Sequence, residues 1–225
     1  MTRAALIACV ASIVTIGGAG PLSAQTPPGR VEVGIGPLWT GQTGLGSSNA
    51  TETTSTGSGS VIFNTTTTVE SVAGLGLHIG VRVWRQLEVE AFSTYAKPTL
   101  STAITNDIEN PTAVTATETM RQYIIGGDAL WYLRVGRSPR LRPYIAGGLA
   151  YLRQLHEGDT LAVTGRVFDF GGGVKYLFGE RPAKSRLRTF GVRGDARIVA
   201  ATKGVGFTDK ARYAPSVGAS LFVRF

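Results

Sequence analysis

Eight segments of this chain alternate apolar residues with polar residues or glycine, and this period of two restricts the possible folds more than any other feature. In the segment 73–83, Leu75, Leu77 and Ile79 fall on one face, while glycines and His78 fall on the other. Side chains of a β-strand point alternately to its two faces, so each such segment is predicted to be a strand with one apolar face. The eight segments are 31–39, 73–83, 87–95, 121–133, 142–152, 167–178, 189–199 and 216–225.

The N-terminus has the three parts of a secretory signal peptide. A basic residue precedes the apolar stretch 4–16, and small residues lead to a cleavage position after Ala24. The alternative, a lipoprotein signal ending at Cys9, has too little apolar sequence before the cysteine. We therefore expect residues 1–24 to be a removed signal peptide and residues 25–225 to form one exported domain. Removal discards the only cysteine, so this domain is expected to fold without disulfides.

The connections between the eight segments distinguish a membrane barrel from a soluble β-sandwich. Residues 41–70 and 97–118 form long connections, whereas 85–86 and 136–141 are short ones. An up-and-down barrel with both termini in the periplasm has outer loops longer than its inner turns, and a sandwich has no such requirement. We therefore predict an all-β fold, an eight-stranded antiparallel up-and-down transmembrane β-barrel. The stretch 61–69 leaves a count of ten strands open.

The last segment keeps its alternation to the final residue, with Leu221, Val223 and Phe225 on one face. Chain ends usually fray, whereas the last strand of a closed barrel pairs with the first. A terminal aromatic preceded by alternating apolar residues resembles the C-terminal insertion signal of outer-membrane barrels. We therefore expect the barrel-insertion machinery and periplasmic chaperones to be partners of this chain.

Charged residues assign the two faces of the strands. A charge in the middle of a bilayer costs about 2–4 kcal/mol, so the charged faces must point into the barrel. The interior of an eight-stranded barrel is filled by side chains, and buried charges there need partners. Glu32 and Asp169 are assigned to this inward face. The expected lumenal charge network consists of Arg82, Glu88, Glu90, Asp128, Lys175, Arg193, Asp195 and Arg197. The alternative is that these charges line a polar permeation path.

The formal net charge of +8 permits binding to nucleic acid or to a membrane surface. The basic residues are scattered, so no nucleic-acid binding is expected. Several lie in the predicted short turns, where outer-membrane lipids would be their partners, although simple solubilisation of the turns explains them equally well. The Ser/Thr-rich stretch 41–69 is expected to be a mobile loop and is a possible contact for a surface ligand.

Three segments taken together resemble a known family. Segment 142–152 opens with Pro-Tyr, 168–178 is rich in glycine, and 190–198 contains an Arg-x-Asp-x-Arg pattern. This order is similar to the opacity-porin-like and OmpA-like outer-membrane β-barrel domains, over residues 30–225. The resemblance implies a location in a Gram-negative outer membrane, and a role as an envelope stabiliser, a surface adhesin or a narrow channel. A peptidoglycan-binding domain is not expected.

Few residues suggest catalysis. His78 lies on an inward face and is interpreted as a hydrogen-bonding residue of the lumen. His156 and Glu157 could be a fragment of a catalytic triad or a loose metal site, but no patterned serine and no second histidine at ligand spacing accompany them. We therefore expect a non-enzymatic barrel without a cofactor, with a structural or surface-interaction role. A narrow porin-like channel is the first alternative, and a lipid-modifying enzyme is the less favoured one.

Overall fold

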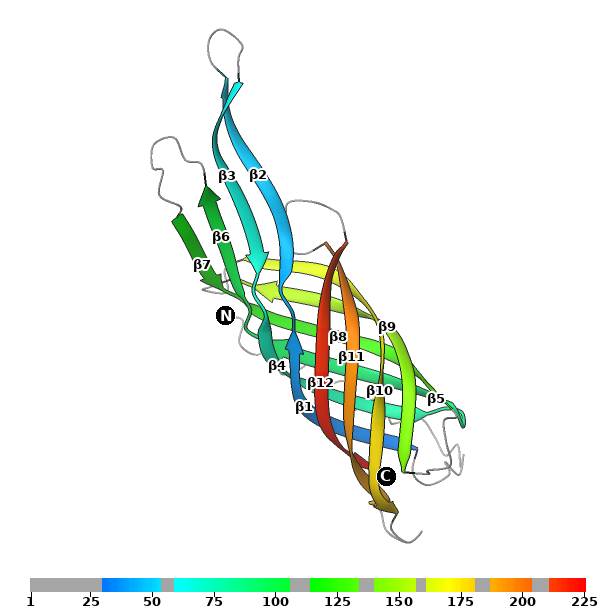
Figure 1. The fold of residues 1–225 in the computed structure, drawn as a ribbon. Coiled ribbons are helices and arrows are strands. Elements are labelled where there is room, and N and C mark those ends of the chain that lie inside the picture. Colours follow the sequence, from blue (N-terminus) through cyan, green and yellow to red (C-terminus); the bar gives the residue numbers. More distant parts are fainter. Residues whose placement is uncertain are drawn as a thin grey trace, which may run out of the picture.

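The computed structural model describes residues 30–53, 59–105, 114–133, 140–156, 161–180, 187–203 and 211–225. The strands in these ranges are β1 (Val31–Thr40), β2 (Thr43–Thr53), β3 (Gly59–Val69), β4 (Val72–Arg82), β5 (Leu87–Ala96), β6 (Thr99–Thr105), β7 (Val114–Thr119), β8 (Arg121–Tyr132), β9 (Leu141–Leu155), β10 (Ala162–Glu180), β11 (Thr189–Lys203) and β12 (Arg212–Arg224). They form two antiparallel sheets (Figure 1). No helix in the described ranges is long and apolar enough to span a bilayer.

Eight of these strands close into a barrel in the order β1-β12-β11-β10-β9-β8-β5-β4, which confirms the predicted fold. The alternative of ten strands is wrong for the barrel, because the additional strands form a sheet of their own. The four C-terminal strands extend further toward the long connections than the apolar alternation indicated. The clearest case is β10, which covers 162–180 instead of 167–178.

The last strand is hydrogen-bonded on both sides up to its end. It pairs with β1, where Ile35 lies opposite Leu221, and with β11, where Val192 lies opposite the same residue. The backbone amide of Phe225 donates to the carbonyl of Val31 at 2.8 Å. The chain therefore finishes inside a closed sheet, at the end of the barrel that carries the tight turn between β4 and β5. We call this the short-turn end and the opposite one the loop end.

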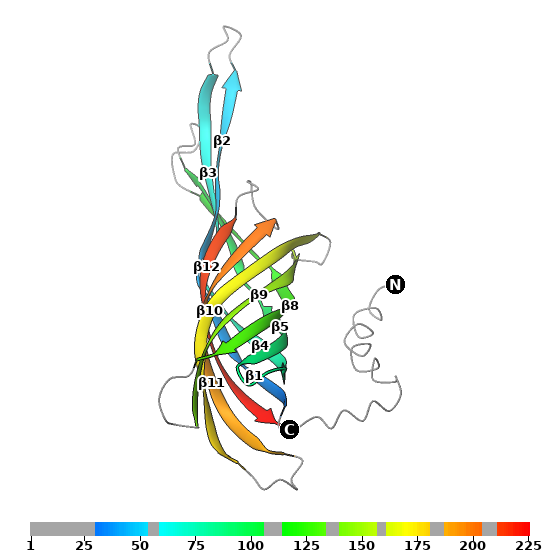
Figure 2. The ribbon, with the colours of Figure 1, turned by 90° about the vertical axis from the view of Figure 1, so that its right-hand side faces the viewer.

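The second sheet has the order β2-β3-β6-β7 and projects from the loop end (Figures 1 and 2). It joins two hairpins through the pairing of β3 with β6, in which Val69 lies opposite Leu100. The stretch 41–69, expected to be a mobile loop, therefore contains two strands instead. Threonine is β-branched and favours extended backbone, and β3 contains four consecutive threonines, at 65–68.

The outer face of the barrel is covered by large apolar side chains, such as Leu149 and Phe170, which are 67% and 66% exposed. Exposed aromatic residues gather near both ends. Those at the short-turn end include Trp84, Trp131, Phe178, Phe190 and Phe225, and those at the loop end include Trp39, Tyr151 and Tyr213. An apolar band between two aromatic girdles is typical of transmembrane barrels. Leu221 and Phe225 of the expected insertion signal are exposed on this outer face.

Candidate functional site

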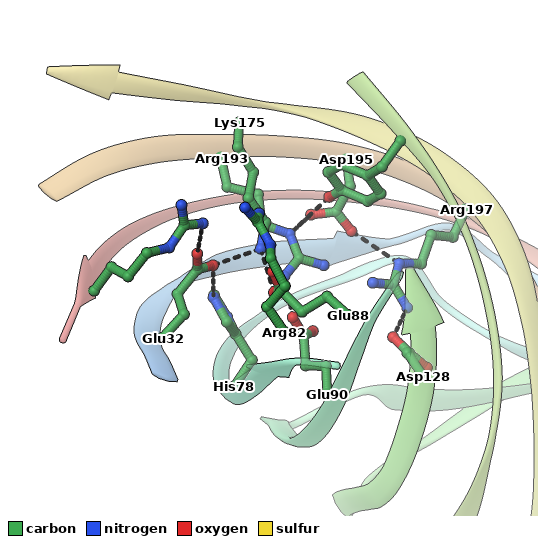
Figure 3. A network of polar contacts seen from close by, with 12 residues as sticks. Glu32, His78, Arg82, Glu88, Glu90, Asp128, Lys175, Arg193, Asp195 and Arg197 are labelled. Carbon is green, nitrogen blue, oxygen red and sulfur yellow. Dashed lines mark hydrogen bonds and ion pairs between the residues drawn. The ribbon is translucent and has the colours of Figure 1, made fainter. Parts of the chain in front are cut away.

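Eleven charged side chains of the barrel strands form two groups in the lumen, and most of them are drawn in Figure 3. Two others, Arg153 and Arg166 near the loop end, are instead exposed on the outer side of the barrel. The group nearer the short-turn end, here the short-turn cluster, consists of Glu32, Arg82, Glu88, Lys175 and Arg224. Lys175 Nζ donates to a carboxylate oxygen of Glu32 at 2.5 Å and to one of Glu88 at 2.7 Å. Arg224 contacts the second oxygen of Glu32 at 2.6 Å, and Arg82 lies 3.6 Å from Glu88. Strands distant in the sequence are thereby tied together across the lumen.

The short-turn cluster is enclosed by aromatic side chains. The hydroxyl of Tyr132 donates to Glu88 at 2.7 Å, and the guanidinium carbon of Arg82 lies 4.7 Å from the centre of the Tyr132 ring. Lys175 Nζ lies 5.6 Å from the centre of the Phe222 ring. Contacts of a cation with an aromatic face add to the ion pairs, and they exclude water from around the buried ammonium.

The other group, here the central cluster, consists of Glu90, Asp128, Asp169, Arg193, Asp195 and Arg197. Arg193 donates to Glu90 at 2.6 Å, to Asp195 at 3.2 Å and to the hydroxyl of Tyr144 at 2.7 Å. Asp195 also accepts a hydrogen bond from Arg197, at 2.9 Å, and therefore links the two guanidinium groups.

Arg197 is shared among three carboxylates of the central cluster. Besides Asp195, it donates to Asp169 at 2.7 Å and contacts Asp128. These carboxylates come from β8, β10 and β11, so one side chain joins three strands. A bidentate guanidinium suits such sharing, because its donors are fixed in one plane.

Three glycines provide the space that these polar side chains occupy. A Cβ atom on Gly148 would lie 2.0 Å from Asp128 Oδ1, and one on Gly80 would lie 2.7 Å from Glu88 Oε1. A Cβ atom on Gly34 would lie 2.3 Å from the ring of His78, whose Nε2 is 3.8 Å from Glu32. Any larger residue at these positions would displace a polar side chain of the lumen.

Above the central cluster, toward the loop end, the lumen contains a cavity of about 190 Å³. Its floor includes Glu90, Asp169, Arg193, Asp195 and Arg197. Its wall side chains are mainly apolar and include Leu38, Phe92, Ile124, Leu152, Val167 and Val199. Residues at the base of the second sheet, among them Leu45 and Val69, line its outer end. The barrel interior thus changes from charged to apolar along its axis.

The structure places all eight residues of the expected charge network in these two clusters. It adds Glu32 and Asp169, which the alternation had assigned to the inward face, and Arg224, which the sequence analysis had not included. Arg224 follows the same alternation, since it lies on the face opposite to Val223 and Phe225. The alternation therefore predicts that Arg224 points inward, but the sequence analysis considered only the apolar residues of this C-terminal segment.

The histidine considered for catalysis contacts a carboxylate of another strand. His156 Nδ1 lies 2.8 Å from a carboxylate oxygen of Glu118, because Arg121, three residues after Glu118, lies opposite Leu155 in the pairing of β8 with β9. Glu157 lies outside the described residues. In the part of the chain that the structure describes, no group of three or more His, Cys, Asp or Glu residues could hold a metal ion.

No protein-family model matches this chain, and no curated protein matches it. Among solved structures, it is similar to Neisserial surface protein A, with a TM-score of 0.49 and 15% identity over 86% of this chain and 97% of that chain. It is also similar to the outer membrane protein OprG of Pseudomonas aeruginosa, with a TM-score of 0.44 and 10% identity over 88% and 96% of the two chains. A third is the outer membrane protease OmpT of Escherichia coli, with a TM-score of 0.35 and 8% identity over 88% and 98%. The likeness concerns the fold alone.

Proposed function

We propose that this chain is a non-enzymatic β-barrel of a Gram-negative outer membrane with a structural and surface-interaction role. The observation that carries the proposal is the closure of the lumen by interlocked ion pairs, while a second sheet extends from the loop end. The ion pairs of such a barrel connect its strands and stabilise the fold. The surface available to a partner then lies outside the lumen, on the second sheet.

The short-turn cluster is the part that opposes conduction. Lys175 and Glu32 are 0% and 1% exposed, and together with Glu88 they connect β1, β5 and β10 across the interior. Removing one partner from a buried ion pair costs about 3–5 kcal/mol, so these side chains are not expected to swing aside for a passing ion. A narrow channel is therefore less well supported than a closed barrel.

The outer surface supports the membrane location. Its apolar band and two aromatic girdles fit the hydrocarbon core and its two interfaces. Arg85, Arg140 and Arg188 lie at the short-turn end, where phospholipid headgroups of the inner leaflet would be their partners. Recognition of the C-terminal strand by insertion machinery and chaperones belongs to the same proposal.

Conductance tests the closed lumen. The mature chain, residues 25–225, is refolded into detergent, checked by its heat-dependent gel shift and added to a planar bilayer, with a trimeric porin as positive control. We expect a folded protein that gives no discrete current steps. Reproducible steps would favour the channel instead.

Cysteine labelling tests which end faces outward. Because the expected signal peptide contains the only cysteine, Thr51→Cys in β2 and Arg85→Cys in the β4–β5 turn each introduce a single thiol. We expect a membrane-impermeant maleimide to label the β2 variant on intact cells and the turn variant only after permeabilisation. Labelling in the reverse order would contradict the proposed orientation and the surface role of the second sheet.

A further inference from the structure

The cavity at the loop end of the lumen has a size and a lining that the role proposed above does not use. Its volume of about 190 Å³ is enclosed mainly by apolar side chains, including Leu38, Phe92, Ile124 and Leu152. A protein cavity of about 150 Å³ with such a lining accommodates benzene. The cavity is therefore large enough for a compound with one aromatic ring or a short alkyl chain.

The floor of this cavity carries an excess of negative charge. The central cluster contains two cations, Arg193 and Arg197. It contains four carboxylates: Glu90, Asp128, Asp169 and Asp195. At the rim, Glu70 and Arg212 contribute one charge of each sign. Because Asp128 does not line the cavity, the two guanidinium groups face three carboxylates at its floor, which leaves one negative charge uncompensated beneath an apolar space.

One carboxylate oxygen of this floor has no hydrogen-bond donor among the described residues. Asp169 lines the cavity, and its side chain is 4% exposed. Its Oδ1 accepts a hydrogen bond from Arg197 at 2.7 Å, whereas its buried Oδ2 accepts none from any residue that the structure describes. A buried charged acceptor of this kind favours a ligand that brings a hydrogen-bond donor.

We propose that this cavity binds a small apolar amine, with its ammonium group beside the Asp169 carboxylate and its apolar body between Phe92, Ile124 and Leu152. A carboxylate ligand would meet the excess negative charge and be repelled. A neutral hydrocarbon would leave the Asp169 oxygen unpaired. Only a cation with an apolar body complements both the floor and the walls.

The ligand preference of the unmodified protein is the first test. The refolded mature chain in nanodiscs of zwitterionic lipid is titrated calorimetrically with phenethylamine, 2-phenylethanol and phenylacetate, and empty nanodiscs provide the reference for partitioning. We expect saturable one-to-one binding of phenethylamine, at least about tenfold tighter than that of the alcohol, and no saturable binding of phenylacetate. Equal affinities for the three compounds, or binding of the amine no stronger than to empty nanodiscs, would overturn the proposal.

Two substitutions test the site itself. Asp169→Asn keeps the size of the side chain, removes its charge and should weaken phenethylamine binding by about tenfold or more. Glu52→Gln makes the same change of charge on the exposed β2 strand and is the matched control, with unchanged affinity expected. Loss of binding in both variants, or in neither, would refute the assigned position of the ammonium. If Asp169→Asn does not fold, the comparison of ligands on the unmodified chain still decides the question.

Discussion

Replacing Lys175 by methionine is the most direct test of the ion-pair network, because this side chain is the centre of the short-turn cluster. Its ammonium is fully buried and donates to two carboxylates, those of Glu32 and Glu88. Methionine fills a similar volume but supplies no charge and no donor, so the substitution isolates the electrostatic contribution from that of packing.

The expected loss of stability depends on the contacts that each carboxylate retains in the variant. Glu32 retains its contact with Arg224 at 2.6 Å, and Glu88 retains the hydrogen bond from Tyr132 at 2.7 Å. Two buried carboxylates nevertheless lose their shortest contacts with a cation. Because removing one partner of a buried pair costs about 3–5 kcal/mol, we expect the free energy of unfolding to fall by about that amount.

Equilibrium unfolding in detergent or lipid, followed by tryptophan fluorescence with increasing urea, measures this change. Lys97→Met is the matched control, since Lys97 is exposed and its replacement should leave stability unchanged. The double variant Lys175→Met with Glu88→Gln should be less destabilised than the sum of the single variants, by about 1–3 kcal/mol, because it removes an uncompensated charge. A Lys175→Met protein as stable as the unmodified one would refute the view that the network holds the barrel together.

Three further outcomes are expected. Gly148→Ala should destabilise the barrel by about 1–3 kcal/mol in the same urea assay, because the new Cβ meets Asp128, whereas Gly194→Ala, with its nearest atom 4.0 Å away, should have little effect. Leu149→Arg places a charge on the exposed apolar face and should lower stability by about 2–4 kcal/mol; an unchanged urea midpoint would contradict a lipid-facing position. Shortening the β2–β3 hairpin by deleting residues 48–65 and inserting an Asn-Gly turn should leave the gel shift of the folded barrel intact, since the hairpin pairs within the second sheet; a barrel that no longer folds would show that this sheet is needed for closure.

The barrel could be predicted from sequence because lipid and lumen impose opposite requirements on alternate residues. Strands such as β4, with Leu75, Leu77 and Ile79 on one face, show this alternation of apolar and polar faces in the sequence. The hairpins of the second sheet do not, since a strand such as β2 has no apolar face to alternate with a polar one. Their signals were the stretch 61–69, which left the strand count open and lies in β3, and a β-branched threonine content that polar connecting segments share.

The membership of the charge network could be predicted, but its pairs could not. Alternation places Lys175 and Glu32 in the lumen, yet they are 143 residues apart in the sequence. Their contact depends on the register of the strands that lie between β1 and β10 around the barrel. No local pattern encodes that register. The charge excess at the cavity floor is a property of the same pairing, and therefore became visible only with the structure.

The second sheet has consequences for how deep the barrel can sit. Its outermost strands, β2 and β7, each have a side without a neighbouring strand among the described residues, unlike the strands of the closed barrel. Backbone amides and carbonyls without partners cannot be accommodated in hydrocarbon, so this sheet has to remain in water or among headgroups. In a bilayer the second sheet would limit how far the barrel can insert. The outer boundary of the hydrocarbon would then lie near Thr40 and Ala96, where β1 and β5 end.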